Sequence, residues 1–280
     1  MEERRFAARA FAALEKNGFR FTRSIGQNFL LDADLVGDLV SLSGVSKGDN
    51  VLEIGPGAGL MTAILAHRGA HVTAVELDAA LEPVLRFVLE GLPVRLVFED
   101  ALKSDFRALM GEEPFRIAAN LPYYITSDAI AKCIKSDLPI QSMAILVQKE
   151  AAERIVSVPG EKSYCALSAL VRSFGEARIL REIPPEHFTP RPHVMSALLS
   201  IEPHAEKPYS VIDQKTLYRV IASAFAMRRK TFANNLISSF ALSRAEAERV
   251  LERSGLHAKV RGEELDVAQF ASVADALTKG

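Results

Sequence analysis

The segment NVLEIGPGAGLMT, residues 50–62, decides the fold because it joins a short apolar run to a helix-like segment through three glycines. The run at 50–55 has the length and aliphatic content of a strand buried on both faces. Gly55, Gly57 and Gly59 let the backbone turn sharply and approach a ligand closely. A strand, a glycine loop and a helix in this order predict the first unit of an open α/β sheet, with a ligand site at the loop.

Four further apolar runs repeat the strand pattern through the middle of the chain. They are HVTAVEL at 71–77, VRLVFED at 94–100, FRIAANL at 115–121 and MAILVQ at 143–148. Helix-length segments lie between them, as expected where right-handed crossovers join parallel strands. Later, the stretches 169–183 and 194–203 resemble strands with no helix between them. We therefore predict an α/β fold with a Rossmann-like sheet that is mostly parallel and has an antiparallel edge.

A change of pattern divides the chain near residue 205. Two prolines and several polar residues interrupt the apolar runs at 202–210, and everything beyond has helical periodicity. We expect a first domain over residues 1–205, which opens with an N-terminal helical segment at 1–30. A small all-helical domain is expected over 206–280.

The net charge of −1 hides an uneven distribution over the 280 residues. Residues 1–30 hold 6 Lys and Arg against 3 Asp and Glu, and residues 203–262 hold 11 against 5. The residues between hold 16 against 23. Basic ends around an acidic middle fit phosphate contacts made away from a central pocket. Chance placement of charges on solvated helix faces explains the same counts.

The sequence lacks several patterns that would indicate secretion, membrane insertion, metal binding or a partner subunit. The N-terminal stretch lacks the apolar core of a secretory signal, and no later stretch is apolar enough to span a bilayer, so a cytoplasmic protein without a membrane partner is expected. Cys133 and Cys165 form no CxxC pair and are interpreted as small core residues, so no metal site is expected. No heptad or apolar stripe calls for a partner subunit, which favours a monomer.

Carboxylates follow the strands at positions suited to an adenosine. Glu76 ends the second strand about 20 residues after the loop, where its carboxylate can accept both hydroxyl hydrogens of a ribose. Asp100 ends the third strand and can accept from an adenine amine. Each acid alone is commonly a strand-end cap, and glycines alone are commonly a tight turn. The three features at successive strand ends together predict a site for an adenosine-containing cofactor.

Two such cofactors fit, a nicotinamide dinucleotide and S-adenosylmethionine. The GxGxG spacing departs from the GxGxxG loop that binds a pyrophosphate. Glu53, two residues before the first glycine, would attract the ammonium group of a methionine-bearing cofactor that has no phosphates. The residues therefore favour the methyl donor, and a nicotinamide oxidoreductase remains the alternative.

The sequence NLPYYITS at 120–127 follows the fourth strand and offers groups suited to a base amine. The lone pair of an aromatic amine is delocalised, so two acceptors bound to its hydrogens would direct that pair toward an electrophilic methyl group. The side-chain oxygen of Asn120 and a backbone carbonyl at Leu121 or Pro122 supply them, and Tyr123 offers a face on which a base can stack. Helix capping by Asn120 is the alternative, although Thr126 or Ser127 suits a cap better.

At this point the chain resembles the KsgA-type ribosomal RNA adenine dimethyltransferases. The resemblance covers nearly the whole chain in order and rests on SIGQNFL at 24–30, EIGPGAGLMT at 53–62, VELD at 75–78, EDAL at 99–102, NLPYYITS at 120–127, FTPRPHVMSAL at 188–198 and FAMRRKTFANNL at 225–236. It implies a class I methyltransferase sheet with S-adenosylmethionine as cofactor. It also implies dimethylation of two adjacent adenosines near the 3′ end of 16S rRNA, in a partly assembled small ribosomal subunit, with a role in ribosome assembly.

The resemblance adds residues that the chemistry alone did not select. Asn28 and the backbone of Leu30 resemble cofactor contacts, and Asn120 would contact both cofactor and target amine. Phe188 resembles a second aromatic wall that sandwiches the flipped adenine against Tyr123.

The basic segment at 225–236 resembles an rRNA-binding element. Drawn as one helix, it places Phe225 on an apolar face, Arg228 and Arg229 beside that face, and Lys230 away from it. The arginines, with Lys230, would then grip rRNA phosphates. A solvated basic helix turn is the alternative.

Two functions near the leading one also fit the motifs. A macrolide-resistance methyltransferase modifies large-subunit rRNA, and the FTPRP and RRKTFANNL segments favour the small-subunit group instead. A binding factor would use the fold without catalysis. Gly55, Glu76, Asp100 and Asn120 are all present, which argues against a dead site.

Overall fold

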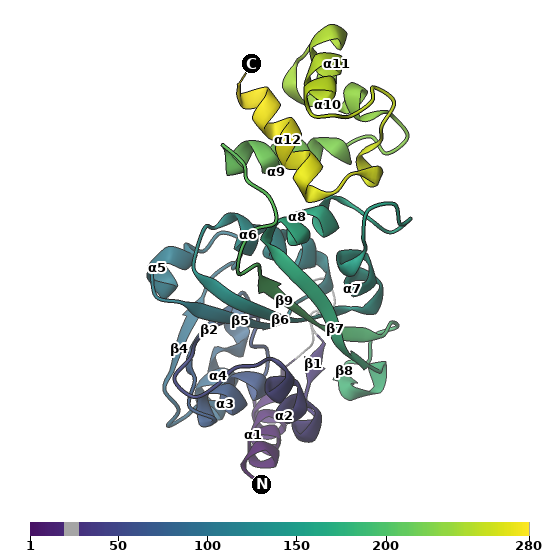
Figure 1. Cartoon of the computed structure of the whole chain (residues 1–280). Coiled ribbons are helices and arrows are strands. Elements are labelled where there is room, and N and C mark those ends of the chain that lie inside the picture. The colour runs from purple at the N-terminus through teal and green to yellow at the C-terminus, as the bar shows by residue number, and fades with distance from the viewer. Residues whose placement is uncertain (20–27, 280) are drawn as a thin grey trace. The chain divides into compact units, whose positions relative to one another are not determined.

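The computed structural model describes residues 1–19 and 28–279 (Figure 1). These residues form two compact units. The sheet unit comprises Met1–Ala152 and Arg178–Pro203, and the helical unit comprises Glu153–Ala177 and His204–Gly280. The helical unit thus takes in 153–177, which the sequence analysis placed in the first domain.

The sheet unit is built on a seven-stranded sheet with the order β4-β3-β2-β5-β6-β9-β7. Strands β4, β3, β2, β5 and β6 run parallel to one another, and β9 pairs antiparallel with β6. The bounds are β2 Asn50–Ile54, β3 His71–Glu76, β4 Val94–Phe98, β5 Phe115–Asn120, β6 Ile140–Gln148, β7 Gly175–Ile183 and β9 Ser196–Pro203. The α/β class, with its mostly parallel sheet and antiparallel edge, is therefore confirmed.

The central strands are mostly apolar because both faces of the sheet are covered. Val51 and Leu52 are neighbours in β2, so their side chains point to opposite faces, and neither is exposed. Helices supply the cover in the sheet unit, with bounds α1 Glu2–Lys16, α2 Ala33–Leu42, α3 Leu60–His67, α4 Glu82–Val88, α5 Phe106–Met110, α6 Thr126–Lys135 and α7 Lys149–Val156.

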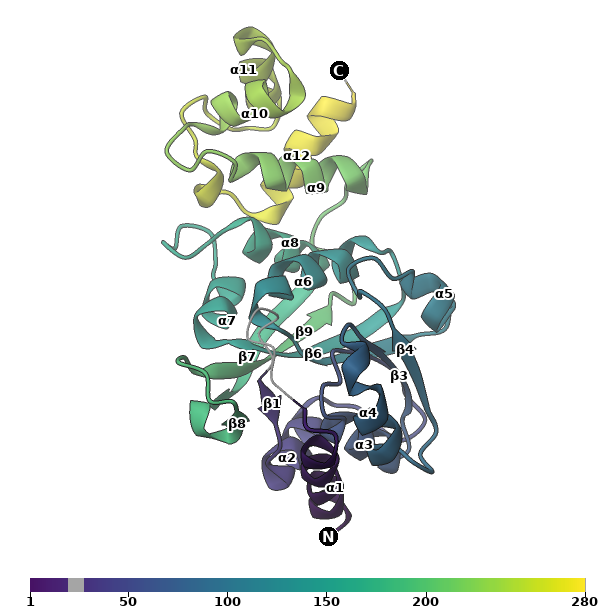
Figure 2. The same cartoon turned by 180° about the vertical axis from the view of Figure 1, so that it is seen from behind.

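Helix α1 packs across α2, α3 and α4, as both cartoon views show (Figure 2). Its apolar face buries Phe6, Ala10 and Leu14, while Glu3 forms an ion pair with Arg68 at 2.6 Å. The N-terminal helical segment predicted over 1–30 is wrong at its end. Phe29–Leu30 forms strand β1, which pairs antiparallel with β8 at Phe188–Thr189. Residues 24–27 of the SIGQNFL motif lie outside the described residues.

The helical unit has its own apolar core. Its helices are α8 Ala166–Phe174, α9 Gln214–Ala224, α10 Phe232–Phe240, α11 Arg244–Arg253 and α12 Val267–Thr278. Phe270 of α12 contacts the rings of Phe225 and Phe232, and the buried Tyr164 donates its hydroxyl to the Leu265 carbonyl at 3.1 Å.

Two elements differ from the sequence prediction. The strand predicted over 169–183 begins as helix α8, because Cys165 and Ser168 form a capping box that starts a helix before β7. The continuous helix predicted over 225–236 is also wrong. Helix α9 ends at Ala224 and residues 225–230 form turns before α10. Phe225 and Phe232, on either side of these turns, both contact Phe270.

In the described parts of the chain, no helix is both long and apolar enough to cross a membrane.

Candidate active site

The candidate site lies where four parallel strands end side by side. Ile54 of β2 pairs with Val75 of β3 and with Ala119 of β5, so the glycine loop, Glu76 and Asn120 leave the sheet at the same edge. This edge, at the carboxyl ends of the strands, is where open α/β sheets bind ligands.

The glycine loop has a backbone that side chains would disturb. Gly55 and Gly57 have φ of 73° and 56°, in the left-handed region that favours glycine. A Cβ on Gly57 would lie 3.0 Å from the ring of Phe29. A Cβ on Gly55 would lie 3.8 Å from the carbonyl oxygen of Asn120, so the loop and the NLPYY segment are neighbours.

Glu76 stabilises the conformation of this loop through hydrogen bonds. Its two carboxylate oxygens accept hydrogen bonds from the backbone N–H of Gly57 at 3.0 Å and of Asp78 at 2.9 Å. Burial raises the pKa of Glu76, and the two N–H groups act in the opposite direction. Each oxygen keeps a second lone pair, so the carboxylate can hold the loop and still accept from ligand hydroxyls in the pocket that it lines.

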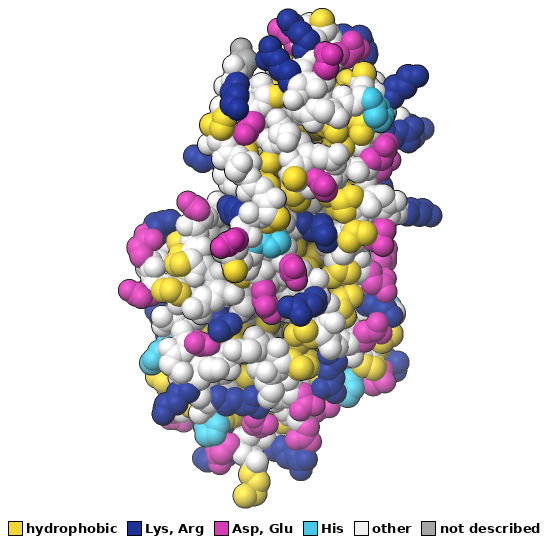
Figure 3. Space-filling model, viewed as in Figure 1, with side chains coloured by type: hydrophobic (Ala, Val, Ile, Leu, Met, Phe, Trp, Pro, Cys, Tyr) yellow, Lys and Arg dark blue, Asp and Glu magenta, His cyan; other side chains and the backbone are white. Residues whose placement is uncertain are grey.

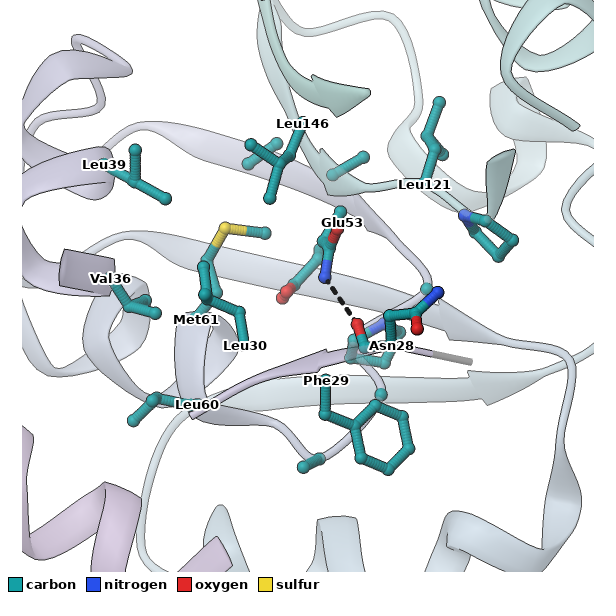
Figure 4. A pocket seen from close by; sticks show the side chains of 18 of the residues that line it. Asn28, Phe29, Leu30, Val36, Leu39, Glu53, Leu60, Met61, Leu121 and Leu146 are labelled. Carbon is teal, nitrogen blue, oxygen red and sulfur yellow. Dashed lines mark hydrogen bonds between the residues drawn. The ribbon is translucent and has the colours of Figure 1, made fainter. Parts of the chain in front are cut away.

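Glu53 differs from Glu76 because its carboxylate forms no hydrogen bond with the described residues. Its side chain is fully buried, and neither carboxylate oxygen has a hydrogen bond among the described residues. Burial raises the pKa of Glu53 to about 8; the nearby Thr62 hydroxyl, which makes no hydrogen bond of its own in the part of the chain that the structure describes, acts to lower it, and the charge of Glu76 acts to raise it. Figure 4 shows the Glu53 side chain in the middle of the pocket, between Met61 and Asn28. A buried, unpartnered carboxylate in a pocket fits a ligand that brings a positive charge or hydrogen-bond donors.

Asn120 presents its side-chain oxygen as an acceptor. Its Nδ2 donates to the backbone carbonyl of Asn28 at 3.3 Å, drawn as the dashed line in Figure 4. That bond fixes the orientation of the amide and leaves Oδ1 without a donor among the described residues. The carbonyl of Pro122 accepts from Ile125 N–H at 3.1 Å, whereas that of Leu121 accepts from no described donor. Of the two carbonyls considered from the sequence, the structure favours Leu121.

The Asn120 side-chain oxygen and the Leu121 carbonyl together are called the target-amine clamp. Tyr123 begins the short 3-10 helix Tyr123–Ile125 that follows this clamp. Its hydroxyl is hydrogen-bonded to the Ser196 hydroxyl at 2.9 Å, which fixes a half-buried ring on the pocket wall, and burial raises the pKa of the phenol. Neither Thr126 nor Ser127 caps α6, because the helix already begins at Thr126 and its N-cap is Ile125.

The pocket brings together most of the residues selected from the sequence. Those that line it are Asn28, Leu30, Glu53, Gly55, Gly57, Glu76, Asn120, Leu121 and Tyr123. Asp100 and Phe188 do not line it. Asp100 lies in the turn after β4, where its Oδ1 accepts from Leu102 N–H at 2.9 Å. Phe188 is 4% exposed and packs in an apolar cluster with Leu39, Leu146 and Leu198, which themselves line the pocket.

Sequence reasoning missed the apolar wall and the rim of this pocket. Val36 and Leu39 of α2, with Met61 of α3, form part of the wall. The apolar face of the 33–42 helix is the signal that would have found it. Leu77 and Tyr124 line the pocket and are 50% and 55% exposed, so they lie at its rim.

The three basic residues selected for RNA belong to the helical unit and are exposed. Arg228, Arg229 and Lys230 lie in the 225–230 turn, and Arg228 donates to the Lys162 carbonyl at 2.8 Å. Figure 3 shows Lys and Arg side chains interspersed with Asp and Glu side chains over the visible face of the molecule.

The family model and the relatives that this chain matches are all described as proteins that methylate ribosomal RNA. Residues 18–279 match the family model described as ribosomal RNA adenine dimethylase. The chain is 37% identical to ribosomal RNA small subunit methyltransferase A of Geobacillus thermodenitrificans, over 94% of this chain and 93% of the relative. It is 39% identical to the protein of that name from Clostridium perfringens, over 95% and 94%.

Two solved structures share the fold. The dimethyladenosine transferase of Plasmodium falciparum aligns with a TM-score of 0.70 and 22% identity, over 86% of this chain and 94% of that one. The 23S rRNA methyltransferase ErmE aligns with a TM-score of 0.65 and 24% identity, over 89% and 99%.

Proposed function

The chain belongs to the ribosomal RNA adenine dimethylase family, and from this premise we propose that it uses S-adenosylmethionine to dimethylate adenine amines of small-subunit rRNA. The observation that carries the proposal is the Asn120 side chain. Its amide is turned so that Oδ1 has no donor among the described residues, beside the equally free carbonyl of Leu121 in the same pocket.

The residues present fit the cofactor. Glu53 offers a buried carboxylate to its ammonium, and Glu76 offers an oxygen to each ribose hydroxyl. Asn28 and the backbone of Leu30 contact the cofactor from the N-terminal side. Asp100 does not line the pocket, and its role as acceptor for the adenine amine rests on its place in the turn after β4 alone. When bound, the cofactor supplies a methyl group on a sulfonium, which is electrophilic.

The chain's own contribution is to position the target amine. Asn120 Oδ1 and the Leu121 carbonyl accept the two amine hydrogens, which draws the nitrogen lone pair out of conjugation with the ring. Tyr123 supports the flipped base. Phe188 does not line the pocket, so a second aromatic wall opposite Tyr123 would require Phe188 to leave its apolar cluster. A strong general base is not needed, because the proton can leave after attack and positioning provides most of the rate.

We assign RNA binding to the helical unit and a specific rRNA site as the substrate. The sheet unit carries the chemistry, and residues 206–280 of the helical unit bind rRNA through Arg228, Arg229 and Lys230, which are exposed and charged. We propose that the substrate is two adjacent adenosines near the 3′ end of 16S rRNA in a partly assembled small subunit, and that a monomer acts there in the cytoplasm.

Mass spectrometry of the substrate RNA tests this function. Small and large subunits from cells lacking the activity are incubated separately with the protein and S-adenosylmethionine, and each rRNA is cut into oligonucleotides by a base-specific ribonuclease so that modified positions can be located. We expect N6,N6-dimethyladenosine at two adjacent positions of 16S rRNA. Modification of 23S rRNA alone, or none of either RNA, would reject the proposal.

A further inference from the structure

Lys132 is a half-buried lysine whose ammonium group is bound to backbone. It lies in α6, and its Nζ donates to the carbonyl of Ala101 at 2.8 Å and to that of Ser104. The ammonium also lies 4.2 Å from the centre of the Phe106 ring. All three partners belong to the segment that follows β4, so Lys132 joins α6 to that segment.

The segment held by Lys132 is the turn that carries Asp100. The Asp100 carbonyl accepts from Lys103 N–H at 2.8 Å and from Ser104 N–H at 2.9 Å, and its Oδ1 accepts from Leu102 N–H. Its Oδ2 lies 3.4 Å from Lys103 Nζ, a side chain that is 84% exposed. The carbonyls of residues 101 and 104 thus flank a turn that sets the direction of the Asp100 carboxylate.

The two hydrogen bonds of Lys132 come from a charged ammonium group and stabilise the position of the Asp100 turn relative to α6. Burial lowers the pKa of Lys132, while nearby acids, Asp100 and Asp105 among them, act to raise it and favour the charged form. Hydrogen bonds from a charged donor are stronger than those between neutral groups. Removing the ammonium leaves both carbonyls without this donor and frees the turn to move relative to α6.

We propose that Lys132 is a positioning residue, which holds the Asp100 turn in place for the adenine of the cofactor. The inference rests on the proposed function, because Asp100 is its adenine contact. Helix α6 begins at Thr126, directly after the 3-10 helix Tyr123–Ile125 that follows Asn120, so the same lysine joins the cofactor turn to the helix next to the target-amine clamp.

Calorimetric titration of the full chain with S-adenosylmethionine tests the proposal. Lys132→Met keeps the length and apolar stem of the side chain and removes only the donor. We expect its Kd for the cofactor to rise about tenfold, equivalent to about 1.4 kcal/mol. Turnover at saturating cofactor should stay within about threefold of native, since the clamp residues are unchanged. Lys132→Arg, which retains a donor, should recover most of the affinity.

A double-mutant cycle separates positioning from general loss of stability. If Lys132 acts through Asp100, then Lys132→Met should add little to the Kd increase caused by Asp100→Asn. Lys135→Met on the same helix, at an exposed position, is the matched control and should bind like the native chain. An unchanged Kd for Lys132→Met, or full additivity with Asp100→Asn, would overturn this inference alone. Absence of binding by the native chain would overturn the proposed function and this inference with it.

Discussion

The pocket at the strand ends and the 225–230 turn of the helical unit use polar groups in opposite ways. In the pocket, Glu53 is fully buried with two oxygens unpaired, and Asn120 is fixed by one hydrogen bond so that its oxygen is free. In the turn, Arg228, Arg229 and Lys230 are exposed to solvent. Buried groups interact strongly because water does not screen them, whereas exposed charges act weakly and depend on salt. Substitutions should therefore have steep effects in the pocket and shallow effects in the turn.

Asn120→Ala should give the largest effect. It removes one of two acceptors for the target amine, and losing one preorganised hydrogen bond in an active site typically costs about 10²–10³ in kcat. Methyl incorporation into unmethylated small subunits, measured with labelled cofactor, checks this. Asn234→Ala in α10, which removes an amide that accepts from Arg244, is the control and should leave methylation unchanged. Equal activity of the Asn120 and Asn234 variants would contradict the claim that substitutions in the pocket have larger effects than those in the helical unit.

Glu53 should link cofactor affinity to pH. Its pKa is raised to about 8 in the free protein, so the carboxyl is mostly protonated at lower pH. A cationic ligand favours the carboxylate, so binding releases a proton and affinity rises as pH increases toward about 8. The limit is about tenfold per pH unit.

Calorimetry in buffers of different ionisation enthalpy measures that proton release. Glu53→Gln keeps the shape of the side chain but cannot titrate, so the rising limb should disappear and affinity at about pH 8 should fall. Loss of the ligand's own ammonium charge at higher pH affects both proteins alike. A native chain whose affinity is flat between about pH 6 and about pH 8 would show that Glu53 does not face the positive charge.

Arg228→Ala and Arg229→Ala should give the smallest effects. Each removes one phosphate contact at a solvated site, so affinity for small subunits should fall only a few fold and the slope of affinity against salt concentration should decrease by about 1. Filter binding at several salt concentrations measures both quantities. Cofactor affinity should not change. A loss of cofactor binding in either variant would contradict the division of labour between the regions.

The sheet and most of the pocket were accessible from the sequence because both depend on local patterns. Apolar runs predicted β2 to β6, and the residue types at their ends predicted the polar groups that line the pocket. Gly55, Glu76 and Asn120 come together because parallel strands end at one edge, which follows from the order of elements alone.

Other features depend on tertiary contacts that no local pattern displays. Phe188 packs among Leu39, Leu146 and Leu198 because β1 and β8 pair, and a strand of two residues leaves almost no signal in the sequence. The turn at 225–230 was missed because a continuous helix would also place Phe225 and Phe232 on one face, so their shared contact with Phe270 does not separate the two structures. The sequence did not identify Lys132 as a positioning residue, because its acceptors are backbone carbonyls about 30 residues earlier and carbonyls are present at every position.

A structure of the chain with a cofactor analogue and an adenosine would test the central claim most directly. The measured quantity is the distance from the adenine amine nitrogen to Asn120 Oδ1 and to the Leu121 carbonyl oxygen. The account predicts that both distances lie within about 3.2 Å, with the ring against Tyr123. An amine bound elsewhere in the pocket, beyond hydrogen-bond reach of Asn120, would contradict it.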